Sequence, residues 1–164
     1  MALIVEDGTG KDDATSFVSR AEYIAYAAAR GVVVADIDAS DIDLIKAVDF
    51  LLAECWRGDV TVATQALPFP RTLYNFDGTL AYPSDEVPTP IKRAQMMLAL
   101  ASKSGVDLMP NFEGGASVTR EKIGPIETEY SEGSLYNRPS FPAVSAAIAP
   151  YQCGQGGSFR VVRV

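Results

Sequence analysis

Apolar residues recur with the spacing of an α-helix in four stretches of the chain. The first stretch begins after Ser19 and stops at Gly31, and the second begins at Ser40 and ends near Gly58. The third begins at Thr89 and ends before Gly105, and the fourth follows Ser140 and ends at Pro150. Glycine and proline are the usual stop signals of helices. The pattern therefore predicts a mainly α protein, a small bundle of three to four helices.

Two of these helices carry start signals. Ser40 occupies an N-cap position with Asp43 at the capping-box position, and Thr89 precedes Pro90 at the first helical position. Apolar residues span more than half of the circumference of the helix after Thr89, so we expect this helix at the centre of the bundle. Phe50 points away from the apolar stripe of its own helix, so it either packs locally or belongs to an interface with another subunit.

From residue 61 to residue 88 the helical period gives way to prolines, Asn75, Asp77 and Gly78, which predict a long, extended loop. Its aromatic side chains offer surface for packing against a neighbour. The predicted subunit interface consists of Phe50, Phe69, Arg71, Tyr74, Phe76 and Tyr82.

Between residues 117 and 131 the pattern changes to alternation around Gly124 and Pro125, which predicts a β-hairpin. With these two residues as the loop, Lys122 lies opposite Glu127, and Arg120 lies opposite Glu129. We interpret these charges as modest ion pairs on a solvated hairpin.

A glycine-rich stretch then precedes a basic and apolar closing segment, whose residues are Phe159, Arg160, Val161, Val162, Arg163 and Val164. An exposed β-prone segment of this kind adds readily to the sheet of another protein. The predicted organisation is one helical domain over residues 1–150 and a flexible docking tail over residues 151–164.

The 164 residues contain no histidine, which removes the commonest general base and metal ligand. Cys55 and Cys153 lie far apart without CxxC spacing and are expected to be inert thiols, since a core of this size requires no disulfide. The aspartates of residues 36–43 lack the glycine and glutamate of a calcium loop, and no phosphate-binding glycine loop is present. We therefore expect no cofactor, no metal site, no catalytic residue and no enzymatic activity.

The net charge of −7 is uneven, with twelve acidic and five basic residues in positions 1–59 and nine of each in positions 60–164. This balance disfavours tight, non-specific DNA binding. The loop aromatics with Arg71, Lys92 and Arg93 nevertheless combine the residue types of a single-stranded DNA surface, which are also those of protein interfaces. No apolar run has the length of a membrane span, and the acidic start does not fit a signal peptide, so we expect synthesis in the cytoplasm.

Several segments in the same order then carry a resemblance that covers nearly the whole chain. They are MALIVEDGTG at the start, WRG at Trp56, TQALPFPR from Thr64, PSDEVPTPIKRA from Pro83, KIGPIETEY in the hairpin and FRVVRV at the end. They resemble a family of tailed-phage and prophage proteins described as DnaT-like single-stranded DNA-binding proteins, which is similar to the head-to-tail connector, or neck adaptor, proteins of long-tailed phages. Phe69 departs from the family, in which tryptophan is expected before the Pro-Arg pair.

The resemblance implies a structural adaptor of the virion neck, made in the host cytoplasm. The chain would form a homo-oligomeric ring, a dodecamer, below the portal protein and around the channel through which the genome DNA passes without sequence-specific binding. The segment Phe159–Val164 would dock on the portal, and the opposite face would receive a tail-side neck or stopper protein. No membrane and no cofactor are implied. The alternative function is that of a single-stranded DNA-binding module.

Overall fold

The computed structural model describes residues 3–75, 77–110, 120–123, 126–129 and 139–154. The helices are α1 (Arg20–Ala28), α2 (Asp38–Leu52), α3 (Thr89–Lys103) and α4 (Pro142–Ile148), which continues into a 3-10 turn, η1 (Ala149–Tyr151). The strands are β1 (Asp59–Val60), β2 (Arg71–Thr72), β3 (Arg120–Ile123) and β4 (Ile126–Glu129). The predicted fold class, a small and mainly α protein with a hairpin, is confirmed.

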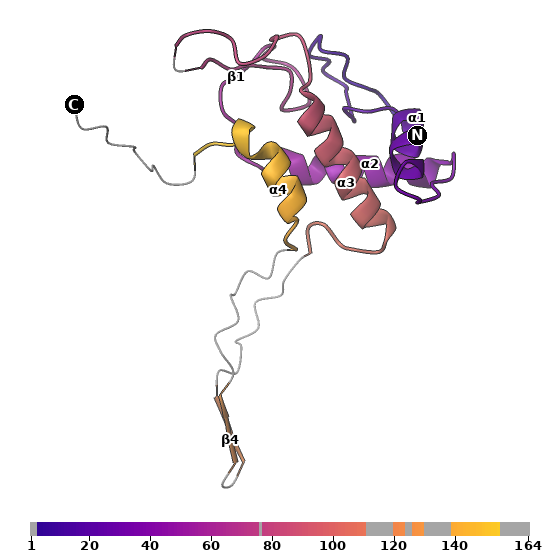
Figure 1. The fold of residues 1–164 in the computed structure, drawn as a ribbon, viewed down its shortest axis with the longest axis vertical. Helices are drawn as coiled ribbons and strands as arrows, with labels where there is room; N and C mark the ends of the chain where they lie inside the picture. The colour runs from indigo at the N-terminus through magenta and orange to yellow at the C-terminus, as the bar shows by residue number, and fades with distance from the viewer. Residues whose placement is uncertain (1–2, 76, 111–119, 124–125, 130–138, 155–164) are drawn as a thin grey trace, which may run out of the picture.

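Helix α3 is the centre of the bundle and packs against α1, α2 and α4 (Figure 1). Ile91, Ala94 and Leu98 are fully buried on this helix, as its wide apolar surface predicts. Gln95 is also fully buried, and its side-chain amide accepts from the Phe17 N–H at 3.0 Å and donates to the Leu44 carbonyl at 3.1 Å. The amide therefore ties α3 to α2 and to the N-terminal segment.

The expected start of α2 is wrong by one turn, and its cap is different. The helix begins at Asp38, and Ser40 lies inside the first turn, where its hydroxyl donates to the Ala35 carbonyl at 2.6 Å. The helix ends at Leu52, so Cys55 and Trp56 follow it instead of belonging to it. The start of α1 is as expected, because Ser19 and Glu22 form a capping box. Helix α3 includes Thr89, which was expected to be its cap.

An arginine explains both the early start of α2 and the acidic run before it. The Arg20 guanidinium contacts Asp36 at 2.9 Å, Asp38 at 3.1 Å and Asp41 at 2.5 Å. The bond with Arg20 lowers the pKa of the Asp41 carboxyl, which is 3% exposed. Asp38 and Asp41 also lie in the first turn, where the helix dipole favours negative charge. These aspartates therefore join α1 to α2.

The hairpin has the predicted register. Strands β3 and β4 pair antiparallel, with Arg120 opposite Glu129, Lys122 opposite Glu127 and Ile123 opposite Ile126. The hairpin contacts no other helix or strand among the described residues and stands apart from the helices in Figure 1. A two-stranded hairpin gains little stability on its own in water. Support for it must therefore come from other parts of the chain or from a partner.

Candidate functional site

The long loop of residues 61–88 is held together by hydrogen bonds within it, and the Ala66 N–H joins it to the N-terminal segment by donating to the Lys11 carbonyl at 2.9 Å. The Gln65 side-chain amide donates to the carbonyls of Leu67 at 2.7 Å and Pro70 at 3.0 Å, and the Thr61 hydroxyl donates to the Ser84 carbonyl at 2.9 Å. The short strand β2 inside the loop pairs antiparallel with β1, which directly precedes the loop. The loop is therefore a built structure that can hold side chains in fixed positions.

Phe69 is fully buried and lies at the centre of an aromatic cluster. Its ring centroid is 5.1 Å from that of Trp56 and 6.1 Å from that of Tyr151, both nearly perpendicular to it. Tyr82 and Tyr151 form the outer layer, with centroids 5.7 Å apart. Edge-to-face contacts of this kind are favourable beyond the area that they bury. The cluster joins the long loop to the segment after α4.

A pocket of about 290 Å³ opens on the outer layer of this cluster. Tyr74 and Tyr82 of the long loop and Tyr151 of η1 line it, together with Arg57 and Asn75. Tyr74 is 58% exposed, whereas Tyr82 and Tyr151 are half-buried. The pocket therefore presents aromatic rings and one guanidinium to solvent, the combination that binds unstacked nucleobases.

Two arginines give this surface positive charge. Arg57 is exposed and makes no ion pair with a carboxylate in the described part of the chain; its Nη1 donates to the Pro150 carbonyl at 3.3 Å. Arg71 donates to the carbonyls of Arg57 at 2.9 Å and Trp56 at 3.3 Å, and also to Gly58. Arg71 therefore fixes the turn that carries Arg57. Its partners in these bonds are neutral carbonyls, which do not offset its positive charge.

The hydroxyls of Tyr82 and Tyr151 remain protonated near neutral pH, because their pKa values are raised. Burial raises the pKa of Tyr82 to about 12, an effect that the nearby Arg71 charge partly opposes, and burial also raises the pKa of Tyr151. The buried Tyr82 hydroxyl has no hydrogen-bond partner among the described residues. A neutral hydroxyl can both donate and accept hydrogen bonds.

A disulfide between Cys55 and Cys153 holds the segment that carries Tyr151 beside the pocket. The expectation that these two cysteines are inert thiols is therefore wrong. The two Cα atoms are 5.4 Å apart, a separation that suits the bond. Beside it, the Arg57 N–H donates to the Tyr151 carbonyl at 2.8 Å, and the Cys153 N–H donates to the Cys55 carbonyl at 3.0 Å. Residues 151–153, which begin the predicted tail, are therefore part of the folded body. The even number of cysteines was the one signal in the sequence, and their proximity depends on the fold.

The structure places the described residues of the predicted subunit interface in different settings, and the interface itself stays a prediction. Phe69 is fully buried and offers nothing to a neighbour, because the aromatic cluster encloses it. Phe50 packs locally against Phe141 at a centroid distance of 5.6 Å, the first of its two expected alternatives. Tyr74 and Tyr82 line the tyrosine pocket, and Arg71 braces it.

Other predicted positions lie elsewhere. Lys92 and Arg93, expected beside the loop aromatics, lie on α3 and do not line the pocket. Phe76 and the predicted docking segment Phe159–Val164 lie outside the described residues, so the roles expected for them stay predictions. Tyr151 and Arg57 were missed, because their meeting depends on the disulfide and the hydrogen bonds beside it.

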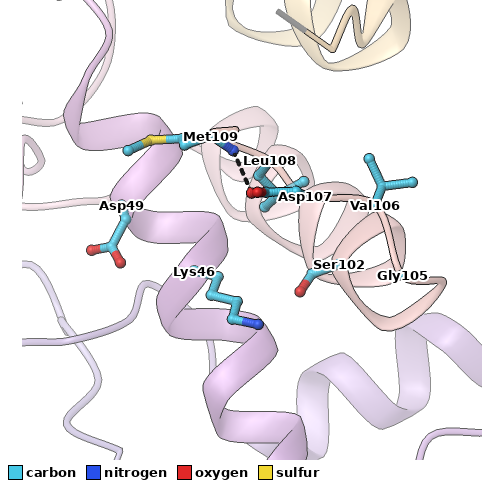
Figure 2. Close-up of a pocket in the computed structure, with 8 residues that line it drawn as sticks. All are labelled: Lys46, Asp49, Ser102, Gly105, Val106, Asp107, Leu108 and Met109. Atoms are coloured by element: carbon cyan, nitrogen blue, oxygen red, sulfur yellow. Dashed lines mark hydrogen bonds between the residues drawn. The ribbon is translucent and has the colours of Figure 1, made fainter. Parts of the chain in front are cut away.

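A second pocket, of about 380 Å³, lies between α2 and the segment after α3 (Figure 2). Figure 2 shows Lys46 and Asp49 on α2, and Asp107, whose carboxylate accepts from the Met109 N–H at 3.1 Å. Ser102 also lines it and donates to Asp43 at 2.8 Å. Charges of both signs on an open surface indicate no particular ligand. Within the described ranges, no three His, Cys, Asp or Glu residues are grouped to hold a metal ion.

Comparisons with known proteins give the family. A family model with the description "Putative DnaT-like ssDNA binding protein" matches residues 1–164. The chain belongs to this family. No curated protein and no solved structure matches it. Family membership agrees with the DnaT-like part of the resemblance, whereas the connector part stays a prediction. No helix in the described part of the chain is long and apolar enough to cross a membrane.

Proposed function

We propose that this member of the DnaT-like family is a non-catalytic module that binds single-stranded DNA. The observation that carries the proposal is the surface around Tyr74, where an exposed aromatic ring shares a pocket with an arginine that has no acidic partner within the described residues. Sequence-independent binding of single strands combines such stacking with cations that track the phosphates. The description of the family supports the same function.

The charge of the chain limits the strength of this binding. A net charge of −7 repels a polyanion, and Lys11 and Arg20 are engaged with aspartates. Among the described residues, the cations beside the tyrosines are Arg57, which lines the pocket, and Arg71, which braces it. We therefore expect micromolar affinity that comes more from stacking than from the release of counterions.

A titration of the whole chain with a fluorescent oligo-dT at several salt concentrations tests the proposal. Each neutralised phosphate contributes roughly −0.7 to the slope of log K against log salt for single strands, so two arginines predict a slope between about −0.7 and −1.4. A duplex of the same length should bind more weakly, since its bases are stacked and paired. Absence of oligo-dT binding at low salt would refute the proposal.

The hairpin favours a second candidate, the structural neck adaptor. Strands β3 and β4 have no support from the other described elements, and a hairpin of this size needs a covering surface. A ring of identical subunits below a portal would provide such a surface. The disulfide-fastened body followed by ten further residues after Gly154 also fits a domain with a docking segment.

Mixing the chain with a portal protein tests the adaptor. Truncation after Gly157 is expected to abolish portal binding and to leave the melting temperature nearly unchanged, because the disulfide and its neighbouring hydrogen bonds remain. A truncated chain that binds the portal like the full chain would exclude the docking role of residues 158–164.

A further inference from the structure

The tyrosine pocket is pre-formed by three segments that main-chain bonds hold in place. On one side, the Ala81 N–H donates to the Leu73 carbonyl at 2.8 Å, which pairs the two halves of the loop around Tyr74. On the other side, the Arg57 N–H and the disulfide hold the segment of Tyr151. A site that needs little rearrangement loses less conformational entropy when a ligand binds.

The size of the pocket restricts its occupant. Its volume of about 290 Å³ lies just below the ~300–1,000 Å³ range of small-molecule sites, so its occupant must be small. Its lining combines aromatic rings with hydroxyl groups, the Asn75 amide and a single guanidinium. A flat, polar-edged ring joined to one anionic group fits both the shape and the charge.

We propose that this pocket takes one unstacked nucleobase of a single strand, with the base against Tyr74 and Tyr151 and the adjoining phosphate at Arg57. The inference rests on the proposed function and adds the location and the stoichiometry of the contact. The remaining nucleotides then lie on the surrounding surface without a pocket of their own, so affinity depends strongly on a few side chains.

The chain offers a matched control. Tyr26 on α1 and Arg30, which closely follows α1, form another tyrosine–arginine pair, in which the guanidinium carbon lies 3.4 Å from the centroid of the ring. This pair does not line the tyrosine pocket. Tyr26→Ala and Arg30→Gln therefore remove the same chemical groups as Tyr74→Ala and Arg57→Gln, but at another place.

The experiment measures oligo-dT affinity and its salt dependence for these four variants and the full unmodified chain, with melting curves to verify folding. Base–aromatic stacking predicts that Tyr74→Ala weakens binding roughly 5- to 150-fold. Arg57→Gln should reduce the magnitude of the salt slope by roughly 0.7. Tyr26→Ala and Arg30→Gln should bind like the unmodified chain.

The possible failures differ from one another. If the unmodified chain binds oligo-dT and Tyr74→Ala binds it equally well, the base site lies elsewhere and the inference is overturned, while the proposed function stands. That result would instead favour a side chain of a protein partner as the occupant of the pocket. If the unmodified chain does not bind oligo-dT, both the inference and the proposed function are overturned.

Discussion

Glu6 has a buried carboxylate that organises the N-terminal loop. It is 1% exposed and accepts the backbone N–H groups of Gly8 at 2.8 Å, Gly10 at 2.9 Å and Lys11 at 2.8 Å. Gly8 has a φ of +103°, and a Cβ there would overlap the Asp85 carbonyl oxygen. The carboxylate therefore folds the loop tightly against the segment that leads into α3.

Replacement of Glu6 by alanine tests this role. The three N–H groups lose a charged acceptor, so we expect the free energy of unfolding to fall by about 3 kcal/mol. Urea denaturation at neutral pH measures the change. Glu86→Ala is the control, because Glu86 is exposed, and it should change stability by less than about 0.5 kcal/mol. Equal effects of the two substitutions would show that the N–H groups find other acceptors.

Asp41 should make stability depend on acid pH. Its bond with Arg20 lowers its pKa in the folded state. Its stabilising effect is then complete above the unfolded pKa of about 3.9 and is lost as the pH falls through the lower folded value. Asp41→Asn should therefore destabilise the protein at pH 7, and the difference from the unmodified protein should shrink between pH 5 and pH 2. Urea denaturation across this range measures it; a constant difference would contradict the assignment.

At the scale of elements, the disulfide joins the segment after α2 to the segment after η1. It closes a sequence separation of 98 residues, and Cys55 is exposed to solvent. Cross-linking so long a loop restricts the unfolded chain strongly. The bond persists in an oxidising environment and is reduced in most cytosols. The stability of the body therefore depends on the redox conditions around it.

Reduction with dithiothreitol is expected to lower the free energy of unfolding by about 4–5 kcal/mol, the loop-closure value for so long a loop. The hydrogen bonds beside the disulfide remain, so the fold should survive. Denaturant titrations with and without reductant measure the loss, and a variant with Cys55→Ser and Cys153→Ser is the control that should not respond. Identical curves for the unmodified chain in both conditions would indicate that the bond does not form.

The sequence predicts those elements whose determinants are local. The register of β3 and β4 follows from alternation around a two-residue loop, and the start of α1 follows from Ser19 and Glu22. The start of α2 was missed because its first turn is fixed by Arg20, which precedes Asp36 by sixteen residues. The pocket was missed for the same reason, since Arg57 and Tyr151 are far apart in sequence and meet only in the folded chain.

At the scale of the whole molecule, the aromatic cluster brings together two of the segments that carry the resemblance, WRG at Trp56 and TQALPFPR from Thr64. Trp56 donates its indole N–H to the Leu51 carbonyl at 2.9 Å, and Phe69 fills the space between Trp56 and Tyr151. The buried half of the cluster holds the body together, and its outer tyrosines form the pocket. Trp56 and Phe69 thus stabilise the fold and support the residues of the tyrosine pocket at the same time.

Photocross-linking to an oligonucleotide that carries 5-iododeoxyuridine tests DNA binding at this site most directly, since halogenated uracil reacts with aromatic side chains that stack on it. Peptide mapping by mass spectrometry should locate the cross-link at Tyr74 or Tyr151. A duplex of the same sequence should cross-link far less. Cross-links confined to peptides that contain neither tyrosine, or no cross-link at all, would contradict single-stranded DNA binding through the tyrosine pocket.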